Sequence, residues 1–540
     1  YTFLIKPKNF PEASPWNDAA MKEWQTLFHS ITRMAQERAV DVYIVPFNIF
    51  VTPEFAKAHN VAMDNLDHDY FVRGDTSEII KRYTRECVTQ MLNEYPGITG
   101  MGLTLGEGMA GMTPQQREDW MTATIIEGMR LANRKSKLIH RIPFSSTTGS
   151  LGITSIETEK LTRTGIEKEA AMGFTEGLIW ADLKFNWSHA HSTIKLVKVH
   201  GGKLYDTYFK PEPTDYKIVW TARNEDFFCL RWGVPSFISS HIVFNKRSYS
   251  GGYIIGSETY IPAKDYFTKD SVGLPWQYAF ERQWLFYKLW GRYLYDPNTP
   301  LQIFNAEFLQ RYGTRGKNLL DASESAGKTA LRIASAFDCG WDFTLYTEGM
   351  MALDTATKRV DYISVDRLIH RPPLDPDYMS IADYAGRSLE TIFSNQITPP
   401  ILAGLLESDC KQALKLVQSI DTKNNKALIY EVADIQTWAF LGLHFAEKIK
   451  GAVALQTYRI KGGDVNKQNA VKHLQQALQY WDEVIRITRP LYKDMPLVHL
   501  SQQGGKETKE NFYFTFHWEK LRADVARDVE VASEAKYKTE

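Results

Sequence analysis

The chain has 540 residues, a formal net charge of zero, and a composition that is 44% hydrophobic and 24% charged. These values are ordinary for a soluble globular protein, and the neutral balance gives no electrostatic footprint for nucleic acid or an anionic membrane. The length exceeds one ordinary domain, so we expect two or three. No stretch is long and apolar enough to span a bilayer. Aromatic residues are abundant, with 14 Trp, 27 Tyr and 28 Phe, which suits a carbohydrate site and a packed core equally.

The cysteines and the start of the chain say little about the compartment. Cys87, Cys229, Cys339 and Cys410 lie far apart, with no CxxC and no metal-like spacing. We expect buried thiols, with a disulfide as the alternative. The chain opens at Tyr1 with neither Met nor a signal-like segment, so it looks trimmed, and any export signal or preceding domain would lie before Tyr1.

From the start to about residue 300, β-like runs alternate with amphipathic segments such as residues 18–38 and 77–95. This alternation predicts a parallel sheet. The seven strand candidates are residues 2–6, 41–51, 98–105, 137–144, 177–184, 217–222 and 252–256. Polar and charged residues gather just after them, as on the catalytic face of barrel enzymes. We therefore predict a (β/α)8 TIM-like barrel in preference to an open doubly wound sheet, with an eighth strand before Tyr1 or within a connector.

An aromatic helix over residues 275–295 is followed by a Pro-bounded break at residues 296–300. This break divides the chain into a catalytic domain, residues 1–297, and a second domain, residues 298–540. Beyond the break the periodicity is helical over residues 318–336, 380–394, 400–420, 427–460, 466–488 and 512–535. We predict an all-α domain that forms either a homo-oligomer interface or a wall of the active site.

Two strand ends each deliver a carboxylate between small residues. Glu107 stands between Gly106 and Gly108, and Glu258 follows a Gly-rich run and precedes Tyr260. A carboxyl group at the end of an apolar strand is partly desolvated, which raises its pKa toward that of a general acid. Paired carboxylates on parallel strands are the groups that cleave glycosidic bonds.

Two further segments supply reserve carboxylates. Asp182 lies on a candidate strand, and Glu225 follows another. Either can replace Glu258 as the second catalytic group, and salt bridging at the sheet edge is the structural alternative. The candidate substrate-binding residues share polar, cationic or aromatic side chains near the strand ends. They are Arg141, Lys184, Trp187, His189, His191, Arg223, Trp232 and Tyr260, where Arg223 has the forked geometry that suits the carboxylate of a uronic acid.

Two motifs are set aside. His189 and His191 stand two residues apart without a third ligand in view, which is weak support for a metal site, so we predict none. Residues 324–329 resemble the end of a phosphate-binding loop, but Ala322 replaces the required glycine and the surroundings are helical.

Several segments resemble bacterial glycoside hydrolases related to the α-glucuronidases of families 67 and 115. They are residues 102–109, 282–297, 395–403 and 434–452. The resemblance implies a (β/α)8 domain followed by helices, no organic cofactor, and exo-action on glycans, with Glu107 at the acid position. It does not fix the sugar or the second carboxylate.

The sequence therefore predicts a glycoside hydrolase with an oligo- or polysaccharide substrate, active in the periplasm or secreted. Glu107 is the predicted acid and Glu258 the predicted base or nucleophile. Two alternatives stay open. One is a polysaccharide lyase that uses His189, His191 and Arg223 next to a uronate, and the other is a non-catalytic glycan-binding protein.

Overall fold

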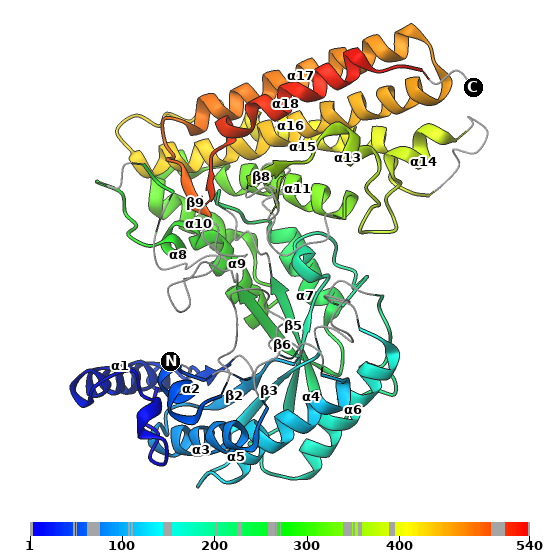
Figure 1. Cartoon of the computed structure of the whole chain (residues 1–540). Coiled ribbons are helices and arrows are strands. Elements are labelled where there is room, and N and C mark those ends of the chain that lie inside the picture. The colour runs from blue at the N-terminus through cyan, green and yellow to red at the C-terminus, as the bar shows by residue number, and fades with distance from the viewer. Residues whose placement is uncertain are drawn as a thin grey trace.

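The computed structural model describes residues 4–46, 49, 51–61, 76–105, 109, 112–143, 154–199, 203–223, 229–256, 265, 267–269, 272–338, 348, 351–354, 359–387, 395–497 and 514–537. The first half of the chain builds a parallel sheet with helices, and the second half builds a stack of long helices beside it (Figure 1). None of the described helices combines the length and the apolarity needed to cross a membrane.

The sheet has six parallel strands that lie in the order in which they occur along the chain. They are β1 (Tyr43–Ile44), β2 (Gly100–Leu103), β3 (Lys137–Arg141), β4 (Ile179–Lys184), β5 (Tyr216–Arg223) and β6 (Ser250–Gly256). Six of the seven predicted strands are thereby confirmed. The described part of the remaining candidate, residues 4–6, is not a strand.

The prediction of a closed (β/α)8 barrel is wrong. The described strands form an open half-barrel in which β1 and β6 are the two edges. After β6 the described chain enters a series of helices, so no further parallel strand is available there to continue the sheet. These helices are α8 (Ala279–Arg282), α9 (Trp284–Tyr295), α10 (Leu301–Tyr312) and α11 (Leu319–Ala336). Strand–helix alternation predicted the sheet correctly, but alternation alone does not determine closure.

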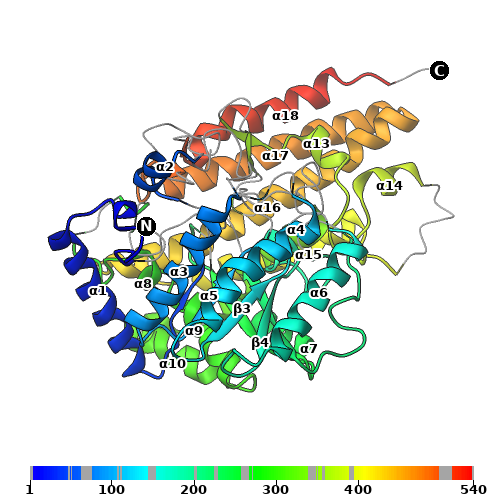
Figure 2. The same cartoon turned by 60° about the horizontal axis from the view of Figure 1, so that its bottom comes forward.

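Helices cover one face of the half-barrel (Figure 2). The strand side chains that meet them, such as Leu103, Leu138 and Leu183, are buried and recur with a period of two, as a pleated strand requires. The helices of this half are α1 (Asp18–Gln36), α2 (Pro53–His59), α3 (Glu78–Glu94), α4 (Pro114–Met121), α5 (Glu127–Arg130), α6 (Ile156–Ala171) and α7 (Pro235–Asn245).

Local signals fix where these helices begin. At α4 the hydroxyl of Thr113 accepts the backbone N–H of Gln116, and the Gln116 side chain accepts the N–H of Thr113. Pro114 occupies the first helical position, where a missing N–H costs nothing. The element therefore starts where its sequence specifies.

The second half contains α13 (Val365–Ile369), α14 (Ile381–Gly386), α15 (Pro399–Val417), α16 (Lys426–Lys461), α17 (Asp464–Thr488) and α18 (Arg522–Glu534). In Figure 1, α16, α17 and α18 run side by side along the top of the molecule. Most predicted helices are confirmed, but the domain is not all-α. It also contains two antiparallel pairs, β7 (Met351–Asp354) with β8 (Arg359–Tyr362), and β9 (Met495–Leu497) with β10 (Phe514–Phe516).

The two halves share a continuous hydrophobic core. The same cluster of buried side chains includes Leu103 of the sheet, Leu285 of α9 and Trp438 of α16. The predicted boundary near residue 297 falls between α9 and α10, and it stays a prediction. Cys87, Cys229 and Cys410 are all buried, as expected.

Close packing among α11, α15 and α16 is sharpest at Gly442. A Cβ atom placed there would lie 2.3 Å from the Cys410 sulfur and 2.5 Å from the Thr329 hydroxyl. Gly404 lies on the exposed side of α15, and a Cβ atom placed there would have no other atom within 4 Å.

We predict that Gly442→Ala destabilises the protein by about 1–3 kcal/mol because the added methyl overpacks this junction. Gly404→Ala is the matched control. It should be neutral or stabilising by up to about 1 kcal/mol, because alanine loses less backbone entropy than glycine when the helix forms and meets no clash here. Chemical denaturation of both variants measures the difference. Equal stability of the two variants would contradict the packing described.

Candidate active site

Three consecutive strands end in cationic residues at one edge of the sheet. β3 ends at Arg141, β4 at Lys184 and β5 at Arg223. Because the strands are parallel, these ends lie at the same edge, where parallel-sheet enzymes build their sites. The register places Arg141 beside Asp182 and Lys184 beside Thr221, so their side chains share a face.

We call this face, opposite the helix-covered one, the inner face. It is lined by Ile139, Arg141, Trp180, Asp182, Lys184, Val219 and Thr221. Asp182 is its best-defined carboxylate. One Asp182 oxygen accepts the Thr221 hydroxyl, and the other lies 4.0 Å from Nε of Arg141. The side chain is buried, so neighbouring donors fix its orientation.

Lys184 and Trp187 are also brought together. The Lys184 ammonium lies 5.5 Å from the centre of the Trp187 ring, a cation–π arrangement. Both side chains are buried. The sequence prediction that these two residues belong to one site is consistent with this contact, while their role in binding substrate stays a prediction.

The turn that follows β4 is strained and firmly held. Asn186 and Trp187 both have left-handed backbone angles, with φ of 52° and 58°, which is unfavourable for a residue as large as Trp. The Asn186 side chain holds the turn. Its oxygen accepts the N–H of Val197 at 2.8 Å, and its amide donates to the carbonyl of Lys195 at 2.8 Å. Strain of this kind persists where the surroundings over-determine it, commonly near active sites.

His189 lies where the turn meets the second half of the chain. Its Nε2 is 3.5 Å from a carboxylate oxygen of Asp338, and Lys198 reaches both Asp338 oxygens at 3.0 Å. A further ion pair joins Lys195 to Asp377. These contacts attach the segment after β4 to the helical half, so that half borders the edge that carries the predicted site.

His191 does not share the environment of His189. Its ring packs against Trp232 at 5.1 Å, Phe286 at 5.5 Å and Trp290 at 5.7 Å between ring centres. Burial lowers the pKa of His191 to about 3, so the ring is neutral at ordinary pH. Trp232 is buried in the same cluster, and its indole N–H donates to the Gly327 carbonyl at 3.0 Å. The structure thus places these two predicted substrate contacts in an aromatic cluster.

Arg231, next to Trp232, anchors the segment after β5 to α16. Its guanidinium donates to Asp434 at 2.7 Å and lies 3.5 Å from Glu431. All three groups are buried, and Tyr312 donates to Glu431 at 2.8 Å. The two carboxylates raise the pKa of Arg231 despite its burial. The network is a compensated set of buried charges.

Sequence reasoning missed Glu348, a fully buried carboxyl group beside the same segment. One oxygen accepts the N–H of Leu230 at 2.7 Å. The backbone carbonyl of Glu348 accepts the indole N–H of Trp518 at 2.5 Å. Burial raises the pKa of Glu348 to about 7, against hydrogen bonds from Cys229 and Leu230 that lower it. No local motif signals this residue, because its partner Leu230 is 118 positions away in the chain.

Four predicted site residues lie outside the described residues: Glu107, Glu225, Glu258 and Tyr260. Arg223 is the last residue of β5, and its side chain lies outside the part that the structure describes. In the sequence, Glu107 is two positions beyond Leu105, the last residue described after β2. Glu225 and Glu258 are each two positions beyond the end of β5 and β6. The structure leaves their roles as predictions.

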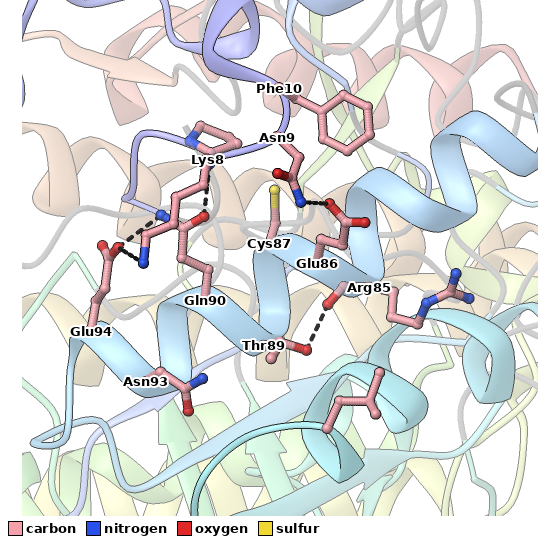
Figure 3. Close-up of a pocket in the computed structure, with 12 residues that line it drawn as sticks. Lys8, Asn9, Phe10, Arg85, Glu86, Cys87, Thr89, Gln90, Asn93 and Glu94 are labelled. Carbon is pink, nitrogen blue, oxygen red and sulfur yellow. Dashed lines mark hydrogen bonds and ion pairs between the residues drawn. The ribbon is translucent and has the colours of Figure 1, made fainter.

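A cavity of about 290 Å³ lies between residues 7–10 and α3, on the helix-covered side of the sheet (Figure 3). Its polar groups bond to one another: the N–H of Lys8 donates to Gln90 at 2.9 Å, and the Asn9 amide donates to Glu86 at 2.8 Å. The cavity is therefore part of the packing of the N-terminal segment, separate from the inner face.

No family model and no curated protein sequence matches the chain. Among solved structures, the fold is similar to that of a GH138 enzyme targeting pectin rhamnogalacturonan II. The TM-score is 0.74 at 17% sequence identity, over 99% of this chain and 75% of that chain. This similarity shows a shared fold. It does not support the resemblance to families 67 and 115, since the neighbour is assigned to GH138.

We predict a pH-dependent effect of Glu348→Gln. The raised pKa of about 7, against 4.5 for an ordinary Glu, means that the folded protein binds this proton more tightly than the unfolded chain. The stabilisation that comes from the protonated Glu348 carboxyl is therefore complete below about pH 4.5 and is lost as the pH rises toward and through 7. A glutamine stays neutral throughout this range.

The variant should therefore match the wild type near pH 4.5 and become relatively more stable by about 1–3 kcal/mol near pH 8. Urea denaturation across this pH range measures the difference, with the exposed Glu54→Gln as a control that should show no trend. A constant difference between wild type and Glu348→Gln would refute the raised pKa.

Proposed function

We propose that the protein is a glycoside hydrolase that acts on a complex glycan. The observation that carries the proposal is the fold similarity across 99% of the chain to an enzyme targeting pectin rhamnogalacturonan II. The ionic groups of the inner face support it. Asp182 and Lys184, which are buried, and Arg141, which is half-buried, stand at the carboxyl ends of neighbouring parallel strands. Enzymes of this architecture place substrate at that edge.

In the proposed mechanism, Glu107 protonates the leaving oxygen of the glycosidic bond. Glu258 acts as general base on water or as nucleophile at the anomeric carbon. Both follow strands of the sheet in sequence, β2 and β6. Glu225, after β5, and Asp182, on β4, are the reserve candidates for the second role. The hydrogen bond from Thr221 and the nearby Arg141 guanidinium favour a positioning role for Asp182.

We further propose that the substrate carries a uronic acid and that the enzyme removes it from a chain end. A sugar carboxylate needs a cationic partner, and Arg141, Lys184 and Arg223 are the cations at the strand ends. Arg141 and Arg223 are more suitable than Lys184, because a guanidinium binds a carboxylate through two hydrogen bonds. Arg141 is the one of the two whose side chain the structure describes. Since complex plant-type glycans lie outside cells, a periplasmic or secreted location follows from the proposal.

The central prediction is that Glu107→Gln and Glu258→Gln each lower kcat by about 10²–10⁴-fold, because each removes a proton-transfer or nucleophilic group from the transition state. Glu530→Gln, an exposed substitution on α18, is the matched control and should leave kcat unchanged. Thermal melting checks that all three variants fold. Reducing-sugar release from uronic-acid-containing and neutral oligosaccharides provides the assay.

Full activity in both Glu variants would reject the proposed catalytic pair. Products that absorb in the ultraviolet through a new double bond would indicate a lyase instead. Binding without turnover across the whole glycan panel would indicate a non-catalytic glycan-binding protein.

A second prediction concerns recognition of the sugar carboxylate. Arg141→Met should lower kcat/KM for a uronic-acid substrate by about 10–100-fold, the loss expected for a charge-assisted hydrogen bond. The same variant should change kcat/KM much less for a neutral sugar in the same linkage, which serves as the internal control. A uniform loss on both substrates would show that Arg141 only supports the fold of the inner face.

A further inference from the structure

A second group of ionisable side chains lies on the helix-covered face of the sheet, apart from the inner face. Glu118 comes from α4, His140 from β3 and Glu169 from α6. All three are buried, with His140 fully enclosed. One potential ligand atom from each lies within 4.8 Å of the others. Three separate elements therefore converge on one small polar space inside the core.

The distances from His140 to the two carboxyl groups are too long for hydrogen bonds. Nε2 of His140 is 3.7 Å from an oxygen of Glu169 and 4.0 Å from an oxygen of Glu118. Nitrogen–oxygen hydrogen bonds have lengths of about 2.7–3.2 Å. Nε2 of His140 and the second oxygen of Glu169 have no hydrogen-bond partner, although both atoms are fully buried. Such groups are costly unless something else satisfies them.

The other nitrogen of His140 is already engaged. Nδ1 lies 3.1 Å from the backbone carbonyl oxygen of Arg141, and only a protonated Nδ1 can donate to that oxygen. The neutral ring then carries its lone pair on Nε2, which faces the two carboxylates. This arrangement, with one nitrogen donating to a carbonyl and the other free to coordinate, is the usual one for a metal-binding histidine.

Charge in the group is not balanced by the protein. Within the described ranges, neither Glu118 nor Glu169 forms an ion pair with a lysine or arginine, and His140 is the only basic group within 4.0 Å of them. Two adjacent buried carboxyl groups are thus held without a compensating cation.

The surroundings make room for the carboxylate of Glu118 and orient it. The Thr162 hydroxyl donates to one oxygen at 2.6 Å. The other oxygen lies over Gly165 of α6, where a Cβ atom would approach it to 3.0 Å. Glycine within a helix costs up to about 1 kcal/mol relative to alanine. At position 165 this cost is offset, because the missing side chain leaves space for the Glu118 oxygen.

We propose that Glu118, His140 and Glu169 bind one divalent transition-metal ion, with Zn²⁺ the best match. One imidazole and two carboxylates are suitable zinc ligands, and zinc lies about 2.0–2.2 Å from such atoms. Two ligands of one ion therefore stand up to about 4 Å apart, which matches the observed separations from His140. The ion neutralises both carboxylates and links α4, β3 and α6. Because the site is enclosed, its role is structural and the ion enters during folding.

The test measures metal in tag-free protein produced in zinc-supplemented medium and dialysed into metal-free buffer. Elemental analysis should find about one Zn²⁺ per wild-type chain. His140→Gln should lower this content by about tenfold or more. His241→Gln, which removes another fully buried imidazole outside the group, is the matched control and should retain the metal.

Gly165→Ala keeps all three ligands and crowds only the Glu118 oxygen. We expect it to weaken zinc retention against a competing chelator by about 10-fold or more, the size of effect that supporting residues have at metal sites. Protein unfolded with chelator and refolded should also melt at a higher temperature when Zn²⁺ is added, and His140→Gln should not show this rise.

A folded wild-type protein without stoichiometric metal overturns the proposal, as does undiminished zinc in His140→Gln. If His140→Gln does not fold, the wild-type content and the Gly165→Ala competition decide the question. The measurements do not involve glycan cleavage, so they are independent of the proposed function.

Discussion

The burial of charge at the junction between the two halves is the constraint on which the rest of the structure depends. Removing an ion from water costs several kcal/mol, and only a close, fully hydrogen-bonded partner recovers that cost. Arg231 is compensated by Asp434 of α16, to which it donates at 2.7 Å, and by Glu431, which lies 3.5 Å from its Nε. Its neighbours Leu230 and Trp232 are held by Glu348 and by the Gly327 carbonyl. The segment after β5 is therefore attached to the second half of the chain at Arg231 and at the residue on either side of it. Lys198 with Asp338 performs the same function for the segment after β4.

Each face of the sheet carries its own group of polar and ionisable side chains. On the inner face, the carboxylate of Asp182 lies near Arg141, and the ammonium of Lys184 lies over the ring of Trp187. On the helix-covered face, the Glu118–His140–Glu169 group is enclosed by α4 and α6 and stays apart from that edge. His140 and Arg141 are adjacent in sequence but point to opposite faces, since side chains alternate along a strand. A single strand, β3, thus contributes to two chemically separate regions.

Much of the fold followed from local patterns, and the errors have physical causes. Short β-like runs located β2 to β6, and helical periodicity located α11, α15, α16 and α17 within a few residues. Closure into a barrel was wrong because pairing between edge strands is a long-range property that no local window contains. Residues 512–518 were expected to be helical, yet 514–516 form β10, because pairing with β9 overrides helical periodicity.

In the predicted site, too, the features that depend on neighbouring residues were predicted and those that depend on distant residues were not. Asp182 and Lys184 were correctly expected to share a face, since strand parity is local. His189 and His191 were treated as a pair, but one meets Asp338 and the other packs among aromatic rings. Glu348 could not be found, because its carboxyl group is held by Leu230, which is distant in sequence.

The junction around Arg231 also has a consequence for folding during synthesis. Arg231 is made 203 residues before Asp434. When Arg231 leaves the ribosome, Asp434 has not yet been made, so the guanidinium stays hydrated until α16 is complete and can cover it.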